Sequence, residues 1–271
     1  MPRPLTAAAL LPAGPLGRLG GRVAVLPEVD STNTYLLAHA AEFGDGAVAV
    51  AEFQTAGRGR QGRRWLAPRG SSVLLSVLLY EPEGSPLITH AAMLAALAAA
   101  EAVEMETDCQ PMVRWPNDLM VAGRKLGGVL AESTPLHPRE GVPRGRRAVA
   151  VGVGLNCLQH RGHFPPELAD IATSIEIESE EPIERATIAR RLLERLDTHF
   201  SREEPDARSW EWLRAAFSAR CDDYGAHVRL VENNREFTGT VIEIADNGDL
   251  MVQLDDGARR RFESTTTTRI Q

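Results

Sequence analysis

The chain has 271 residues, of which 43% are hydrophobic and 25% charged, so its composition is that of an ordinary globular protein with a sizeable core. The formal net charge of −7 argues against generic binding of DNA or RNA, because that mode of binding needs a basic surface that displaces counterions from phosphates. The three cysteines form no close pair and the longest apolar run, residues 91–100, is far shorter than the about 20 residues that cross a bilayer, so we expect a cytoplasmic protein with neither a disulfide framework nor a membrane span.

Helices and strands are predicted in alternation through the first half of the chain. Residues 1–22 are interrupted by Pro12 and Pro15 and are expected to form a loosely structured tail. Ser31 is placed to cap a helix that runs to about Phe43. A longer helix is predicted at residues 87–106, which are rich in alanine and free of glycine and proline. Short apolar runs typical of buried strands lie at residues 47–53, 72–79, 112–115, 126–132 and 148–155.

The last third of the chain changes from helical to strand patterning. Apolar residues recur at helical spacing between residues 184 and 200, and Trp210, Leu213 and Phe217 repeat the pattern in a second helix. From Gly225 onward the sequence alternates in short strands joined by turns rich in asparagine, aspartate and glycine. These predicted strands, at residues 227–231, 236–244 and 250–254, are typical of a small β-barrel.

The predicted elements together indicate an α/β or α+β layered protein with two domains. We expect a tail at residues 1–22, a large domain at residues 23–221 and a small β domain at residues 222–271. Residues 135–147 contain three prolines and are expected to form an exposed loop of the large domain.

The most informative stretch is residues 54–65, named here the arginine–glycine loop, in which four arginines alternate with three glycines. Glycine lets a backbone fold closely around a ligand, and guanidinium groups offer paired donors to phosphate or carboxylate oxygens. The loop matches the Gly-x-Gly-x-x-Gly pattern of dinucleotide-binding folds, but Pro68 and Gly70 oppose the helix that such folds need next. We therefore expect a bound anion, with Trp65 as a hydrophobic lid or as a stacking surface for an apolar part of the ligand, although such a loop taken alone is more often a solvated basic segment.

A second group of polar residues follows in Arg114-Trp-Pro-Asn-Asp-Leu119, a rigid turn that presents Asn117 and Asp118 side by side. Asp118 is a candidate contact for Mg²⁺ on a nucleotide, because Mg²⁺ prefers oxygen ligands, but no certain metal ligand is assigned. Lys125 starts the next strand, where two glycines leave room for a ligand, so its ammonium group can neutralise a carboxylate or an α-phosphate. Taken alone, an Asx turn and a surface lysine are the ordinary interpretations.

A third stretch, Gly152-Val-Gly-Leu-Asn156, ends an apolar strand with two glycines and an amide. Asn156 can both donate to and accept from an adenine edge, although Gly-x-Gly alone more often marks close strand packing. Cys157, His160 and His163 follow in a loop without a fourth metal-ligand residue beside them, which favours a solvated loop over a metal site.

Taken together, these stretches resemble the catalytic domain of biotin protein ligases, which attach biotin to carboxyl-carrier domains. The likeness covers residues 31–177 and includes the helix start at Ser31, the arginine–glycine loop, the Trp-Pro-Asn-Asp sequence and the strand that begins at Lys125. It implies an α+β fold with a mixed sheet and helices, a class II synthetase-like catalytic domain, and a small C-terminal SH3-like β-barrel. The chain departs from the family at Arg114, where a lysine is usual. Only about 30 residues precede Ser31, so it resembles the monofunctional members without an N-terminal DNA-binding domain.

The resemblance also implies roles for individual residues. Catalytic roles are implied for Lys125, Arg60 and Asp118. Biotin contacts are implied for Ser31, Thr32, Asn33, Gln54, Gly57, Arg58, Arg60, Trp65, Lys125, Gly127 and Gly128. Nucleotide contacts are implied for Arg58, Arg60, Arg63, Trp65, Asn117, Lys125 and Asn156.

The implied activity is ATP-dependent formation of biotinyl-5′-AMP and transfer of biotin to a lysine of a biotin carboxyl carrier domain of a biotin-dependent carboxylase. ATP and Mg²⁺ are the implied co-substrate and activator, biotin is the substrate, and a homodimer is left open. Two alternatives stand beside this hypothesis. One is a lipoate or octanoate ligase or transferase, which shares the architecture and chemistry, and the other is a biotin-sensing binding or regulatory protein, which the negative charge disfavours.

Overall fold

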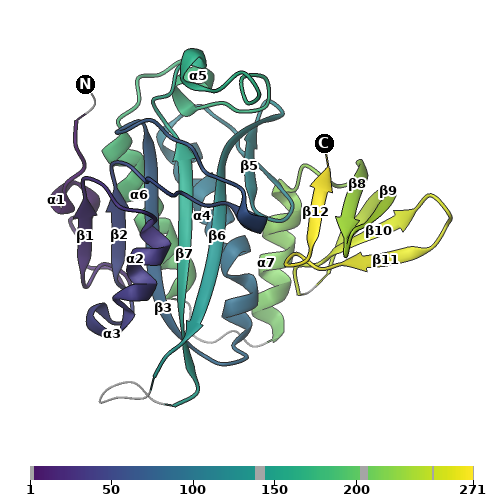
Figure 1. Cartoon of the computed structure of the whole chain (residues 1–271), viewed down its shortest axis with the longest axis horizontal. Helices are drawn as coiled ribbons and strands as arrows, with labels where there is room; N and C mark the ends of the chain where they lie inside the picture. The colour runs from purple at the N-terminus through teal and green to yellow at the C-terminus, as the bar shows by residue number, and fades with distance from the viewer. Residues whose placement is uncertain (1–2, 138–143, 202–206, 246, 271) are drawn as a thin grey trace.

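A mixed seven-stranded sheet in the order β1-β2-β3-β7-β6-β5-β4 forms the centre of the protein (Figure 1). The structure is a computed structural model that describes residues 3–137, 144–201, 207–245 and 247–270. Strands β1 and β2 are parallel, and all other neighbours in this sheet are antiparallel. The strands are β1 (Val23–Leu26), β2 (Val48–Ala51), β3 (Ser72–Pro82), β4 (Met112–Arg114), β5 (Asp118–Val121), β6 (Arg124–Pro135) and β7 (Arg146–Asn156). All five strands predicted in this part of the chain are confirmed, and β1 and β5 are additional.

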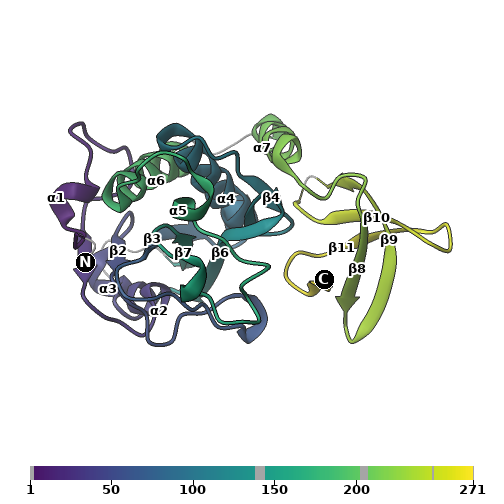
Figure 2. The same cartoon turned by 90° about the horizontal axis from the view of Figure 1, so that it is seen from above.

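Helices cover both faces of this sheet (Figure 2). On one face α4 (Pro86–Glu106) packs on α6 (Arg185–Phe200) and contacts α7 (Ala207–Arg220). On the other face lie the short helices α2 (Thr32–Ala38) and α3 (Ala40–Phe43). The three longer helices confirm the predicted helical patterns, except that the side chain of Trp210 lies outside the described residues.

Helix α4 is the buried centre of the helical layer. Ser85 caps it by accepting a hydrogen bond from the backbone N–H of Leu87, and Pro86 occupies the first turn, where its missing N–H costs nothing. The helix has 21 residues and is, by length and composition, long and apolar enough to cross a membrane. However, 72% of its most apolar 18-residue stretch is buried inside the protein. Its alanines let α6 and the sheet approach closely, so its apolar character serves the core.

The N-terminal segment is packed on the large domain, so the expectation of a loose tail was wrong. Leu5, Leu10 and Leu19 are buried in the main core, and the short helix α1 (Ala7–Leu10) lies against α6. Asp197 of α6 accepts hydrogen bonds from the backbone N–H groups of three consecutive residues, Gly17 to Leu19, at 2.7 to 2.8 Å. These contacts join segments about 180 residues apart, which is why the proline-interrupted sequence gave no sign of them.

The C-terminal part is a separate five-stranded antiparallel sheet in the order β11-β10-β9-β8-β12. Its strands are β8 (His227–Glu232), β9 (Arg235–Ile244), β10 (Leu250–Leu254), β11 (Arg259–Phe262) and β12 (Thr267–Ile270). Asn233 and Asn234 both have positive φ angles, as the tight turn of a two-residue hairpin requires. Within the described residues no pairing joins β11 to β12, so the fold is a mixed α+β protein whose second unit is an all-β sheet.

The predicted exposed loop at residues 135–147 is shorter in the structure, because β6 extends to Pro135 and β7 begins at Arg146. The middle of this predicted loop, residues 138–143, lies outside the described residues.

Candidate active site

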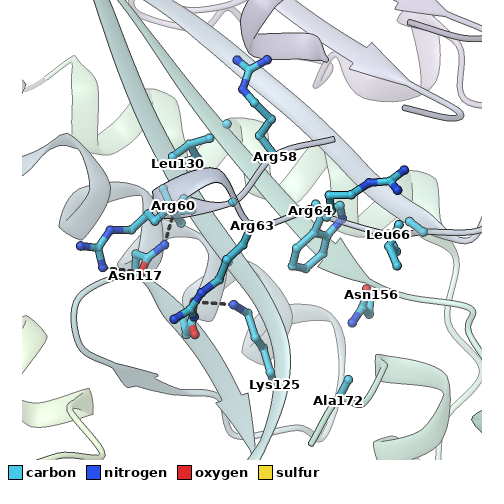
Figure 3. Close-up of a pocket in the computed structure, with 18 of the residues that line it drawn as sticks. Arg58, Arg60, Arg63, Arg64, Leu66, Asn117, Lys125, Leu130, Asn156 and Ala172 are labelled. Atoms are coloured by element: carbon cyan, nitrogen blue, oxygen red, sulfur yellow. Dashed lines mark hydrogen bonds and ion pairs between the residues drawn. The ribbon is translucent and has the colours of Figure 1, made fainter. Parts of the chain in front are cut away.

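A cavity of about 760 Å³ opens where the arginine–glycine loop crosses the ends of β6 and β7 (Figure 3). This volume is typical of a site for a small organic ligand. The walls come from α2, the arginine–glycine loop, the turn before β5, strands β6 and β7, and the segment before α5 (Ile175–Glu178). Strand β12 of the C-terminal sheet contributes Thr268, Arg269 and Ile270 to the same cavity.

The start of α2 forms a polar end of the cavity. Ser31 takes the predicted N-cap position with extended φ and ψ, but its side chain makes no capping hydrogen bond. The backbone N–H and the hydroxyl of Thr32 both donate to Gln54 Oε1, at 2.8 and 3.1 Å. Ser76 Oγ, fully buried on β3, lies 2.7 Å from Thr32 Oγ1. Ser31, Thr32 and Gln54, which were predicted to share one site, do lie together in the structure. No feature of the sequence indicated Ser76.

Asn33 is committed to the protein and not to the cavity. Its Oδ1 lies 2.7 Å from Ser76 Oγ, and its Nδ2 donates to the backbone oxygen of Leu130 at 3.0 Å and to Glu132 Oε2 at 2.9 Å. A Cβ on Gly152 would stand 2.5 Å from Asn33 Oδ1, so this position of β7 must be glycine. Asn33 thus fixes α2 to β3 and β6 and lies close against β7, and both N–H bonds of its amide are used within the protein.

Arg58 does not converge on the predicted anion site. Its guanidinium donates to both carboxylate oxygens of Glu132 at 2.9 Å and to Thr34 Oγ1 at 2.7 Å. Figure 3 shows it pointing away from Lys125. Glu132 therefore receives hydrogen bonds from Arg58 and from Asn33, and it joins the loop to α2.

Arg60 enters the region between the two sheets. It contacts Asn117 Oδ1 at 3.5 Å and the backbone oxygens of Thr267 and Ser264, the first at 3.2 Å. Burial lowers the pKa of Arg60, the negative charge of Asp118 opposes this shift, and the positive charge of Arg63 adds to it. Arg60 and Arg63 thus form a concentrated positive field beside Asp118, which favours an anionic ligand.

The arginine–glycine loop folds as a small hairpin. The backbone N–H of Gly59 donates to the carbonyl of Arg63 at 2.7 Å, and that of Trp65 donates to the carbonyl of Gly57 at 2.9 Å. A Cβ on Gly57 would stand 2.7 Å from the carbonyl oxygen of Trp65, so the hairpin needs glycine there. A single 3₁₀ turn, Arg60–Gly62, is the one helical element between β2 and β3, which agrees with the rejection of a dinucleotide-binding fold.

Trp65 lies over β7 as a wall of the cavity. A Cβ on Gly154 would stand 2.8 Å from the indole ring, so the absence of a side chain at this position lets the ring approach the strand. Lys125 Nζ lies 5.9 Å from the centroid of a Trp65 ring, within the range of a cation–π contact. The indole N–H is buried and has no hydrogen-bond partner among the described residues, so it is available to a ligand.

Lys125 and Asp118 form an ion pair of 2.6 Å inside the cavity. Lys125 is the second residue of β6 and Asp118 is the first residue of β5, and the pairing of these two antiparallel strands places the side chains together. Asn117 anchors this turn, because its Nδ2 donates to the carbonyl of Val129 at 2.5 Å. A Cβ on Gly128 would lie 3.4 Å from Asp118 Oδ1 and 3.5 Å from Lys125 Nζ, so a side chain there would fill the space beside the pair.

Gly127, in contrast, serves strand packing. A Cβ at this position would stand 2.7 Å from the carbonyl oxygen of Gly154 on the neighbouring strand. Asp118 is the one carboxylate among the described residues that line the cavity, and no group of three or more metal-binding side chains occurs in the described part of the chain. One carboxylate beside a basic loop suits a Mg²⁺ ion that is held mainly by phosphate oxygens and water.

The far end of the cavity contains the amide pair Asn156 and Gln159. Asn156 Nδ2 donates to the carbonyl of Thr173 at 2.9 Å, and Asn156 Oδ1 accepts from Gln159 Nε2 at 2.9 Å. Sequence reasoning selected Asn156 and missed Gln159, which follows the Gly-x-Gly strand without a recognisable motif. It also missed β12, whose approach is a long-range tertiary contact.

Known ligases resemble this chain in sequence. Residues 25–147 match the model of the Biotin/lipoate A/B protein ligase family. The biotin–[acetyl-CoA-carboxylase] ligase of Mycobacterium tuberculosis is 34% identical over 87% of this chain and 84% of its own length. The bifunctional ligase/repressor BirA of Bacillus spizizenii is 28% identical over 81% of this chain, which spans only 65% of that relative.

A solved structure shares the fold of nearly the whole chain. The biotin protein ligase of Aquifex aeolicus, in complex with biotin and ATP, has a TM-score of 0.74 and 24% identity and covers 93% of this chain and 99% of its own. At that level of identity the likeness shows the fold alone, and the fuller match to the mycobacterial ligase carries the assignment. This chain therefore belongs to the biotin protein ligases of the biotin/lipoate A/B protein ligase family.

Proposed function

We propose that this protein joins biotin to ATP, forming biotinyl-5′-AMP and pyrophosphate, and then passes the biotinyl group to a lysine of a carboxyl carrier domain. One observation carries the proposal. A single cavity joins a polar end at Thr32 and Gln54, the indole of Trp65 and the ion pair of Lys125 with Asp118. Biotin has a polar ureido ring, an apolar middle and a carboxylate, and these three parts fit the three regions in that order.

Biotin is the acid that this arrangement favours. Gln54 Oε1 accepts from Thr32, so its amide N–H group is left to donate to a ureido oxygen, and Ser31 lies beside it. Trp65, which packs over the glycine strand β7, supplies an apolar wall of the cavity for the middle part of biotin. The carboxylate at the end of the aliphatic chain of biotin then reaches Lys125, whose ammonium group offsets the negative charge.

In the first step a carboxylate oxygen of biotin attacks the α-phosphorus of ATP, and the bond to the pyrophosphate oxygen breaks. Both reactants are anions, so positive charge must first cancel their repulsion. We propose that Lys125, Arg60 and Arg63, which line the cavity, supply this charge. A Mg²⁺ ion held by the phosphates and by Asp118 would draw charge onto the departing pyrophosphate.

In the second step the neutral amine of the carrier lysine attacks the acyl carbon. The bond between that carbon and the phosphate oxygen breaks, AMP leaves, and an amide forms. The mixed anhydride hydrolyses if water reaches it, so we propose that the arginine–glycine loop and Trp65 shield it between the two steps.

The C-terminal sheet belongs to this machinery in our proposal. Arg60 donates to the carbonyl of Ser264 before β12 and to that of Thr267, the first residue of β12, and Gln61 accepts from Thr268. We propose that residues 222–271 form an SH3-like domain that holds the loop in place and borders the entrance used by the carrier domain.

Incubation of the pure protein with ATP, Mg²⁺ and either biotin or lipoate tests the proposal, with the acyl-adenylate detected by mass. Biotinyl-5′-AMP should form and the lipoate reaction should give no more than a trace. A second incubation with a carrier domain should add one biotinyl group to it, and a carrier whose acceptor lysine is arginine should stay unlabelled. An adenylate of lipoate alone, or nucleotide binding without an adenylate, would contradict the proposal.

A further inference from the structure

We infer that Gln159 reads the 6-amino group of the purine base, and so makes the site selective for ATP. The inference rests on the proposed function, because it takes the base of ATP to lie at the Asn156 end of the cavity. Gln159 lines that cavity and is 1% exposed. Its Oε1 has no hydrogen-bond partner among the described residues.

The orientation of the Gln159 amide follows from its neighbours. The carbonyl of Thr173 can only accept, so the Nδ2 of Asn156, 2.9 Å away, must face it. Asn156 Oδ1 then faces Gln159, whose Nε2 donates to it at 2.9 Å and to Ser72 Oγ at 2.6 Å. A flipped amide would set two oxygens against each other, so Oε1 is the unsatisfied atom.

The backbone of Gln159 is fixed as well. Its carbonyl accepts from the hydroxyl of Ser174 at 2.6 Å, and the N–H of the preceding Leu158 donates to the carbonyl of Ser71 at 2.8 Å. A side chain held at both ends cannot turn to find water or another donor. A buried acceptor left without a donor is destabilising, and a ligand that supplies one removes this cost.

The surroundings of Gln159 suit a flat base with apolar faces. The same cavity is lined by Phe164, Leu168 and Ile171. Figure 3 shows Asn156 and Ala172 on the side of the cavity away from Arg60, where the phosphates are proposed to lie. Adenine presents two N–H donors at position 6, whereas guanine presents an oxygen that would repel Oε1. A single acceptor therefore both selects adenine and rejects guanine.

The same observations add a role for Asn156 to the nucleotide contact that the resemblance implies. Its Nδ2 donates to Thr173 and its Oδ1 accepts from Gln159. Asn156 therefore orients Gln159, and Gln159 supplies the acceptor that faces the base.

The test compares ATP with purine riboside triphosphate, which has hydrogen in place of the 6-amino group. Wild-type protein should form the adenylate from ATP with a kcat/KM roughly tenfold higher than from the analogue, the loss of one buried hydrogen bond. In Gln159→Leu this ratio should fall towards 1, because neither nucleotide meets an acceptor. Gln159→Met, whose flexible chain fills irregular space, replaces the leucine variant if that variant fails to fold.

Two results would overturn the inference: a wild-type ratio near 1, or a ratio in the variant as large as in wild type. If no nucleotide reacts at all, that result contradicts the proposed function but not the role of Gln159. The ratio of the two nucleotide dissociation constants, measured by calorimetry, then still decides whether Gln159 reads the base.

Discussion

Replacing Gly154 by alanine tests whether Trp65 forms one wall of the biotin site. An added Cβ would stand 2.8, 3.0 and 3.1 Å from three atoms of the indole ring, closer than such contacts normally occur. Gly154 is not in the left-handed region of φ, so the strand backbone accepts alanine without strain. The substitution should therefore act only by displacing the indole ring of Trp65.

The indole must retreat by about half an ångström, or the strand must yield. Overpacking of this kind costs about 1 to 3 kcal/mol. Because 1.4 kcal/mol corresponds to a factor of ten, the dissociation constant of biotin should rise by a factor of roughly 5 to 140. The loop that carries Trp65 lies at the surface, so the thermal unfolding midpoint should change little.

Calorimetric titration with biotin in the absence of nucleotide measures this effect directly. Gly162→Ala is the matched control, because a Cβ there meets nothing within 4 Å. In a Trp65→Ala background the Gly154 substitution should add almost nothing, since the ring it displaces is gone. Biotin affinity in Gly154→Ala within twofold of the control would refute the packing of Trp65 against β7.

Further predictions concern charge. Lys125→Ala should abolish adenylate formation while the circular dichroism spectrum stays unchanged, and normal adenylate yield by mass would remove Lys125 from the chemistry. Arg60→Gly severs the contacts to Ser264 and Thr267, so the adenylate should escape and label lysines of an added bystander protein, and full retention of the intermediate would contradict this role. Burial raises the pKa of Glu101, but hydrogen bonds and charge from His199 and Arg195 outweigh it and lower that pKa from 4.5 to about 2. Ionised Glu101 thus stabilises the fold above pH 4.5 and loses this effect as pH falls towards 2. Glu101→Gln should therefore lower the free energy of unfolding by about 2 kcal/mol at pH 7, after an allowance for solvent screening, and by little at about pH 2. A urea-unfolding difference that stays constant across this pH range would refute the assignment.

The parts of the site that sequence reasoning found are those built from neighbouring residues. Lys125 and Asp118 are seven residues apart, and a strand turn suffices to bring them together. Gly152 and Gly154 are two residues apart, so both face the same side of strand β7. The space they leave is taken by the amide of Asn33 and the indole ring of Trp65.

The parts that sequence reasoning missed depend on pairs far apart in the chain. Glu132 holds Arg58 across 74 residues, and this contact turns a predicted ligand arginine into part of the scaffold. Arg60 meets the carbonyl of Ser264 across 204 residues. The composition of a basic loop indicates that it attracts anions. Which of its arginines are already paired with a carboxylate of the protein depends on the tertiary fold.

The position of β12 has a practical consequence for work with this protein. Ile270 lines the cavity proposed for biotin and ATP, so a purification tag joined directly after this strand would begin beside that cavity. Helix α1 lies on the far side of the large sheet from β12 (Figure 1). The Arg3 side chain, shortly before α1 in the chain, is 92% exposed, so a tag on this side leaves the cavity clear. Kinetic measurements on a carboxy-terminally tagged protein should therefore be repeated after the tag has been cleaved.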